Sequence, residues 1–133
     1  MNYLIDTQII IWFQLNDKQL KPDIYSILVD VENKIFISDI SLYEIAIKKK
    51  ISKLPSFLAT IEDIIIVGNQ DGFTFLPISH NHISAYDSIP VFENHKDPFD
   101  RLILATALSE NLILVSADEK FKQYKTLIRL IEA

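Results

Sequence analysis

The sequence of 133 residues contains no cysteine. This absence excludes disulfides, thiolate zinc sites and cysteine nucleophiles, and it fits a cytoplasmic protein. Gly68 and Gly72 are the only glycines, so no glycine-rich loop is present to cradle a nucleotide phosphate. No apolar run approaches the roughly 20 residues needed to cross a bilayer. The first residues lack the basic and apolar regions of a signal peptide, so we expect a cytoplasmic protein.

Basic residues are also too few to outweigh the acidic ones, and the formal net charge is −5. This balance argues against a passive nucleic-acid binder, because phosphate affinity comes from lysine and arginine. It does not argue against an enzyme whose acidic site binds cations. The lysines form two groups, which are either solvated helix faces or phosphate contacts: Lys48, Lys49, Lys50 and Lys53, and then Lys120, Lys122 and Lys125.

Apolar segments of strand length alternate with segments of helical periodicity along what we expect to be a single domain, residues 1–133. We predict strands at residues 2–5, 34–38, 73–76, 112–115 and 127–130, and helices at 7–15, 22–31, 41–50, 56–69, 79–88 and 98–110. Such alternation indicates a parallel sheet covered on both faces. The predicted fold is therefore an α/β/α sandwich of three layers with a mostly parallel sheet of four or five strands.

Four acidic residues follow predicted strands or begin helices at related positions: Asp6, Glu44, Asp100 and Asp118. The carboxyl ends of parallel strands share one edge of a sheet, so acids placed there can converge. Two unit charges about 4 Å apart repel by roughly 1 kcal/mol in water and about 4 kcal/mol near a protein surface. A divalent cation with oxygen ligands, Mg²⁺ or Mn²⁺, removes that repulsion. The pattern therefore predicts a metal site.

Each acid also has a purely structural interpretation. Asp6 and Asp118 suit turns or helix caps, and Glu44 completes a capping box that starts at Ser41. Asp97 can cap the helix that begins at Pro98, and Asp100 can pair with Arg101. The three histidines, His80, His82 and His95, do not form a metal-binding set, and surface or capping roles are expected for them.

The segments that contain these acids resemble the PIN-domain family, and most of all the VapC-like toxins of bacterial type II toxin–antitoxin systems. They are Tyr3-Leu4-Ile5-Asp6-Thr7, Ser41-Leu42-Tyr43-Glu44-Ile45-Ala46-Ile47-Lys48, Asp97-Pro98-Phe99-Asp100-Arg101 and Val115-Ser116-Ala117-Asp118. They occur in the family's order and cover essentially the whole chain. The second and third are specific, whereas the first and last alone would not be.

The resemblance implies a Mg²⁺- or Mn²⁺-dependent endoribonuclease. Its catalytic and metal-binding acids would be Asp6, Glu44, Asp100 and Asp118, supported by Thr7, Asp97 and Ser116. It also implies a homodimer and inhibition by a VapB-like antitoxin that covers the acidic groove. One departure is Gln8, where this subgroup often has histidine; it leaves the acids intact and bears on substrate contact.

Our hypothesis from the sequence is hydrolysis of an RNA phosphodiester in which Asp6 and Asp100 hold the principal ion and Glu44 and Asp118 complete the site. Arg101 and Lys48, the first of the Lys48–Lys53 group, are candidate phosphate contacts. The alternatives are a PIN-like nuclease that acts on DNA or in RNA processing outside a toxin–antitoxin pair, and a noncatalytic PIN-like interaction module. A phosphoaspartyl receiver domain is disfavoured, because Thr7 and Gln8 stand where such domains have a second acid.

Overall fold

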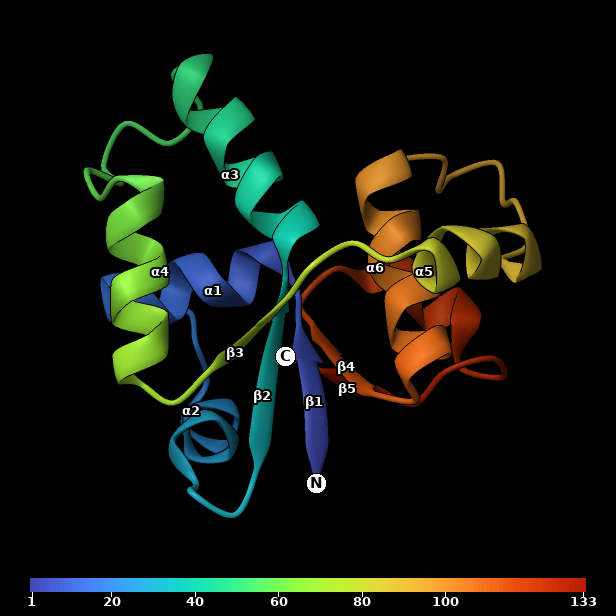
Figure 1. Ribbon diagram of the computed structural model, residues 1–133, viewed down its shortest axis with the longest axis horizontal. Helices are drawn as coiled ribbons and strands as arrows, with labels where there is room; N and C mark the ends of the chain where they lie inside the picture. The colour runs from blue at the N-terminus through green and yellow to red at the C-terminus, as the bar shows by residue number, and fades with distance from the viewer.

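The computed structural model describes residues 1–133 and contains one sheet of five strands (Figure 1). The strands are β1 (Asn2–Ile5), β2 (Lys34–Ser38), β3 (Thr74–Leu76), β4 (Ile113–Ser116) and β5 (Leu130–Glu132). Their order across the sheet is β3-β2-β1-β4-β5, and every pair of neighbours is parallel. The predicted parallel sheet is confirmed, with β1 at its centre.

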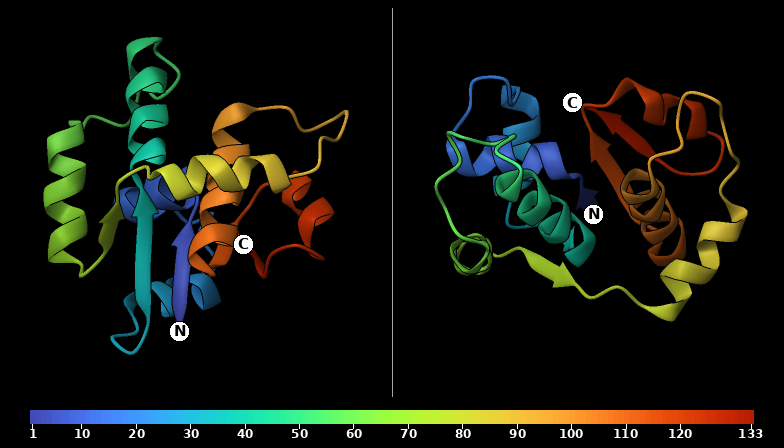
Figure 2. Two further views of the ribbon diagram at one scale, coloured as in Figure 1. Left: turned by 45° about the vertical axis from the view of Figure 1, so that its right-hand side comes forward. Right: turned by 90° about the horizontal axis from the view of Figure 1, so that it is seen from above.

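Helices connect the strands and cover both faces of the sheet. They are α1 (Thr7–Leu15), α2 (Pro22–Val29), α3 (Asp39–Lys50), α4 (Ile61–Gln70), α5 (His80–Ala85) and α6 (Pro98–Glu110), with 3-10 turns η1 (Tyr86–Ser88) and η2 (Glu119–Tyr124). Helices α1, α2 and α4 lie on one side of the sheet, and α5 and α6 lie on the other (Figures 1 and 2). No helix is both long enough and apolar enough to span a bilayer.

Alternation along the strands divides the core into two halves. Tyr3 and Ile5 of β1 belong to a cluster of 17 buried residues, whereas Leu4 between them belongs to a cluster of 12 on the opposite face. Strand β4 alternates in the same way. Because successive side chains of a strand point to opposite faces, a run that is apolar throughout is buried on both sides. The predicted three-layer sandwich is confirmed.

The register of the central strands brings their carboxyl ends to one edge. Leu4 of β1 lies opposite Phe36 on one side and Leu114 on the other, and Ile5 lies opposite Val115. Beyond the strand, the backbone N–H of Asp6 still donates to the carbonyl of Val115 at 3.1 Å. Strands β1, β2 and β4 therefore end at the same edge of the sheet, and α1, α3 and η2 begin there.

Helix starts differ from the prediction by more than one residue at two places. The N-cap of α3 is Ser38, whose hydroxyl accepts from the N–H of Ile40, so Ser41 lies inside the helix and does not begin a capping box. Helix α4 begins at Ile61 rather than at residue 56, because Thr60 and Asp63 form a reciprocal capping box there. Helix α6 spans the predicted residues 98–110 and ends in a left-handed cap at Asn111.

The two glycines have different roles, and only Gly72 is a turn residue, with a φ of +82°. Gly68 lies inside α4, within the helix predicted over residues 56–69. A Cβ on Gly68 would lie 2.6 Å from Cζ of Phe75 in β3. Its small size therefore lets α4 pack closely on the sheet.

Arg101 ties the segment after α5 to helix α6. Its side chain is buried, and its guanidinium donates to the hydroxyl of Tyr86 at 3.0 Å and to the carbonyls of Pro90 and Ile89 at 2.8 and 2.9 Å. The Tyr86 ring also lies beneath the guanidinium, 4.9 Å away. A buried charge is tolerated when its donors are used in this way.

We predict that Arg101→Ala lowers the free energy of unfolding by roughly 2–4 kcal/mol, because it leaves the buried Ile89 carbonyl without its donor and removes the contacts to Pro90 and the Tyr86 ring. Urea denaturation followed by circular dichroism measures the change. Arg129→Ala is the matched control, since Arg129 makes a single exposed bond to the Asn111 carbonyl. An equal loss in both variants would contradict a structural role for Arg101.

Candidate metal centre at the carboxyl edge of the sheet

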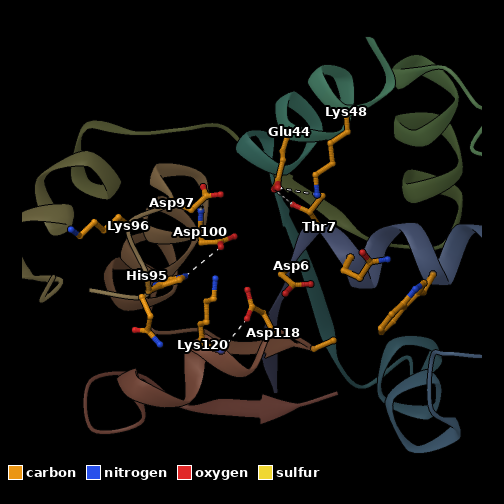
Figure 3. A pocket seen from close by; sticks show the side chains of 14 residues that line it. Asp6, Thr7, Glu44, Lys48, His95, Lys96, Asp97, Asp100, Asp118 and Lys120 are labelled. Carbon is orange, nitrogen blue, oxygen red and sulfur yellow. Dashed lines mark hydrogen bonds and ion pairs between the residues drawn. The ribbon is translucent and has the colours of Figure 1, made fainter. Parts of the chain in front are cut away.

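A cavity of about 540 Å³ opens at the edge where the strands end. Its walls come from the start of α1, from α3, from the loop and first turn of α6, and from the segment after β4 (Figure 3). All four predicted acids line it: Asp6, Glu44, Asp100 and Asp118. The topology thus brings together residues that are separated by up to 112 positions (118 − 6 = 112) in the chain.

Asp6 is the most deeply placed of these acids, with 6% of its surface exposed. Its Oδ1 accepts from the N–H of Ile9 at 3.2 Å, so it caps α1 as well as facing the cavity. Its Oδ2 accepts a hydrogen bond from the hydroxyl of Ser116, and that hydroxyl accepts from the N–H of Asp118 at 3.0 Å. Ser116 therefore holds the Asp6 carboxylate and the Asp118 backbone together across β1 and β4.

Glu44 lies one turn into α3 and is held by two neighbours. The hydroxyl of Thr7 donates to its Oε1 at 2.6 Å, and Nζ of Lys48 lies 3.3 Å from its Oε2 (Figure 3). The capping interpretation of Glu44 is wrong, because Ser38 caps the helix. Its carboxylate is free to face the other acids.

Asp97 and Asp100 have separate roles at the start of α6. Asp97 is the N-cap, and its Oδ1 accepts from the N–H groups of Phe99 and Asp100 at 2.8 and 3.4 Å. Asp100 makes no ion pair with Arg101, whose donors are used elsewhere. Its Oδ2 instead lies 3.3 Å from Nε2 of His95.

His95 was expected at the surface or in a cap, and that expectation is wrong. The ring is buried, with 2% exposed, and its Nδ1 lies 2.6 Å from the hydroxyl of Tyr124. Phe121 packs against the ring edge to face. Burial lowers the pKa of His95 and favours the neutral ring. One ring nitrogen fixes the imidazole on Tyr124, and the other orients Asp100. The capping expectation does hold for His82, which completes the Ser79 capping box.

The ionised state is disfavoured at two of the acids, Asp6 and Asp100. Burial raises the pKa of Asp6 to about 6, against the hydrogen bonds from Ser116 and Ile9, and the charges of Asp118 and Glu44 add to the rise. Burial raises the pKa of Asp100 to about 7, and the charges of Asp97, Glu44, Asp118 and Asp6 add to it. Each carboxylate disfavours ionisation of the others, which indicates a shared cation.

The donor set fits a hard divalent cation. Ligand atoms of His95, Asp100 and Asp118 lie within 4.8 Å of one another, and Asp6 adds a further carboxylate at the floor of the cavity. Carboxylate oxygens are the ligands that Mg²⁺ and Mn²⁺ prefer. No lysine or arginine pairs with Asp6, Asp100 or Asp118. Because both nitrogens of His95 are already bonded, we interpret it as the residue that orients Asp100.

Three lysines surround the acids. Lys48, Lys96 and Lys120 line the cavity, whereas the other clustered lysines lie outside its lining. Lys49 donates to the carbonyl of Phe57, and Lys125 lies 2.7 Å from Glu132. Lys48 lines the cavity while its Nζ pairs with Glu44, and its phosphate contact stays a prediction. The placement of Arg101 opposes its own predicted phosphate contact, because this side chain is buried outside the cavity lining.

Comparisons with known proteins agree with this geometry. The family model described as the PIN domain matches residues 3–127. No curated protein sequence matches. Among solved structures, VapBC2 from Rickettsia felis, bound to a DNA fragment from the promoter, has 21% identity and a TM-score of 0.66, over 99% of this chain and 98% of the other.

Two further structures have the same fold. A toxin–antitoxin complex from Klebsiella pneumoniae has 22% identity and a TM-score of 0.63, over 97% of this chain and 95% of the other. VapBC-1 from nontypeable Haemophilus influenzae has 20% identity and a TM-score of 0.63, over 99% and 98%. At such identities the likeness establishes the fold alone. The family match, which spans nearly all of the sequence, establishes more: the chain belongs to the PIN domain family.

Proposed function

We propose that the chain is a Mg²⁺- or Mn²⁺-dependent endoribonuclease and the toxin of a VapBC-like toxin–antitoxin pair. PIN domains are generally nucleases that use divalent metal ions, and the similar solved structures include VapBC complexes. The observation that carries the proposal is that four carboxylates line one cavity together with lysines, and that the pKa values of Asp6 and Asp100 are both raised.

Each residue has a defined task in this proposal. Asp6 and Asp100 would hold the principal ion, and Glu44 and Asp118 would complete the site. When bound, a divalent cation polarises the phosphodiester and lowers the pKa of water. Thr7 and Ser116 orient two of the carboxylates through hydrogen bonds, at 2.6 Å from Thr7 to Glu44. Lys96 and Lys120 would contact flanking phosphates by charge.

The pair Asp97 and Asp100 provides a sharp test, because the two acids lie on one helix turn. Asp100→Asn removes a ligand charge, and we expect RNA cleavage with Mn²⁺ to fall at least about 100-fold. Asp97→Asn keeps a good helix cap, so we expect less than about a 10-fold loss. Cleavage of end-labelled RNA under single-turnover conditions measures both rates. Equal losses would contradict the separation of roles.

The contact between His95 and Asp100 predicts an indirect effect on the metal. Tyr124→Phe deprives His95 of its fixed partner, and we expect Mn²⁺ affinity to fall about 10-fold, near the low end of the usual effect of such supporting contacts. Isothermal titration calorimetry measures the affinity without any reaction. Tyr86→Phe is the matched control, since it loses a hydroxyl bonded to Arg101 rather than to the site. Unchanged Mn²⁺ affinity in Tyr124→Phe would rule out the positioning role.

The raised pKa values predict that stability falls with rising pH in the absence of metal and that a divalent ion removes this fall. Without divalent ions, the folded state binds more protons than the unfolded chain between the ordinary pKa of 3.8 and the values of about 6 and 7. Stability is therefore greatest at the acid end of this window and falls as pH rises through it. Urea midpoints in EDTA should fall from pH 5 to pH 8, and added Mg²⁺ should restore stability mainly at pH 8. A urea midpoint that rises with pH in EDTA would contradict the raised pKa values of Asp6 and Asp100.

The toxin role has its own test, separate from the chemistry. Induced expression should arrest growth of the host, and co-expression of a small antitoxin from the neighbouring reading frame should relieve it. Sequencing of RNA ends after induction identifies the target.

Cleavage of DNA alone would favour the alternative of a DNA-directed nuclease. Light scattering of the purified chain tests the expected homodimer.

A further inference from the structure

The only tryptophan of the chain, Trp12, lies in the wall of the acidic cavity. It follows Gln8 by one helical turn on α1, so the two side chains are neighbours on one face of the helix. Both line the cavity together with the acids, and Ala117 is the only other apolar residue there. Trp12 and Gln8 are not needed to hold a cation, so we consider which other ligand their part of the wall could bind.

Trp12 packs against the 17-residue core cluster but is only partly covered by it. Ile9, Ile10 and Ile11 of the same helix are buried, whereas Trp12 is only half-buried. Phe13, its neighbour in sequence, packs on Tyr25 and Phe73, but Trp12 makes no aromatic pair. Neither its indole N–H nor the Gln8 amide bonds to another residue, and neither is among the buried groups without a partner. An aromatic face and an amide are therefore available to a ligand.

The walls of the cavity differ in chemistry. Helix α1 lies on the opposite side of Asp6 from the loop that carries His95 and Lys96 (Figure 3). A strand whose phosphate lies over the acids would meet lysine charge on the loop side and the Trp12–Gln8 surface on the α1 side. Indole faces stack on any nucleobase, and amides hydrogen-bond to base edges.

We propose that Trp12 and Gln8 form a nucleobase subsite, in which the base beside the cleaved phosphodiester stacks on the indole and the Gln8 amide contacts its edge. The inference rests on the proposed nuclease function and names its substrate class: single-stranded RNA, whose bases are free to leave a stack. A duplex keeps its bases paired and presents no such face. Gln8 then tunes which base is preferred.

Binding tests the subsite without any reaction. In the full-length Asp100→Asn variant, held in EDTA, the emission of Trp12 should be quenched by a hexaribonucleotide. A hexamer of equal charge with one abasic position at the subsite should quench far less. Fluorescence anisotropy of labelled RNA should show about a 5- to 150-fold weaker Kd when Trp12→Ala is added, the range for one stacked base. Tyr25→Ala, which alters an exposed aromatic on α2 outside the cavity, should leave the Kd unchanged.

Cleavage provides the second measurement, with the active chain and Mn²⁺. Trp12→Ala should raise KM for intact RNA toward the value for the abasic substrate, with a smaller effect on kcat. Trp12→Phe should recover part of the loss, because it restores an aromatic face. Gln8→Ala should change the preference among the four bases at the cleavage position.

The outcomes separate this subsite from the nuclease proposal. Normal Mn²⁺-dependent cleavage by Trp12→Ala with an unchanged KM overturns the subsite and leaves the nuclease intact. Quenching of Trp12 by RNA in a chain that cleaves no nucleic acid overturns the nuclease and supports the subsite. Quenching by an antitoxin segment but by no oligonucleotide overturns the subsite, since the indole then serves a protein partner.

Discussion

The parallel pairing of β1 with β2 and β4 is the constraint on which the site depends. Because Leu4 is aligned with Phe36 and Leu114, the three strands end together, and whatever follows them shares one edge of the sheet. The hydrogen bond from Ser116 to Asp6 then crosses from β4 to β1 at that edge. A shift of register by one residue would turn these side chains to the other face and dissolve both the core and the acidic cluster.

Burial and like charge oppose ionisation of the acids at this edge. Hydrogen bonds from neighbouring residues, rather than basic side chains, stabilise most of these carboxylates. Ser116 and Ile9 stabilise the Asp6 carboxylate, Thr7 holds Glu44, and His95 holds Asp100. The lysines remain at the rim, apart from the Lys48–Glu44 pair. A site arranged in this way sacrifices stability in the absence of a cation and recovers it when a cation binds, as is usual for functional sites.

Much of this arrangement was predictable because the sheet is buried on both faces, and its strands are therefore apolar runs ended by polar residues. Helix α6 was predictable to the residue from Pro98 and Asn111. His95 was not, since it lies in an irregular loop and its partner Tyr124 is 29 residues away. The contacts of Arg101 could not be predicted for the same reason. Its partners include backbone carbonyls of a loop, and the sequence does not reveal which carbonyls lie near it. Ser38 and Ser41 compete as caps for one helix, and only the end of β2 decides between them.

The residues of the DPFDR block, 97–101, have different roles, and most of these roles serve folding. Asp97 caps a helix, Pro98 begins it, and Arg101 fastens the preceding loop, so these letters serve folding. Asp100 lies among the other acids of the cavity and is not needed as a cap, whereas Asp97 lines the same cavity while capping the helix. A relative that has abandoned catalysis would therefore still need most of the block in order to fold. A match to this block therefore indicates first of all a folded domain, and its central acid alone bears on the proposed metal site.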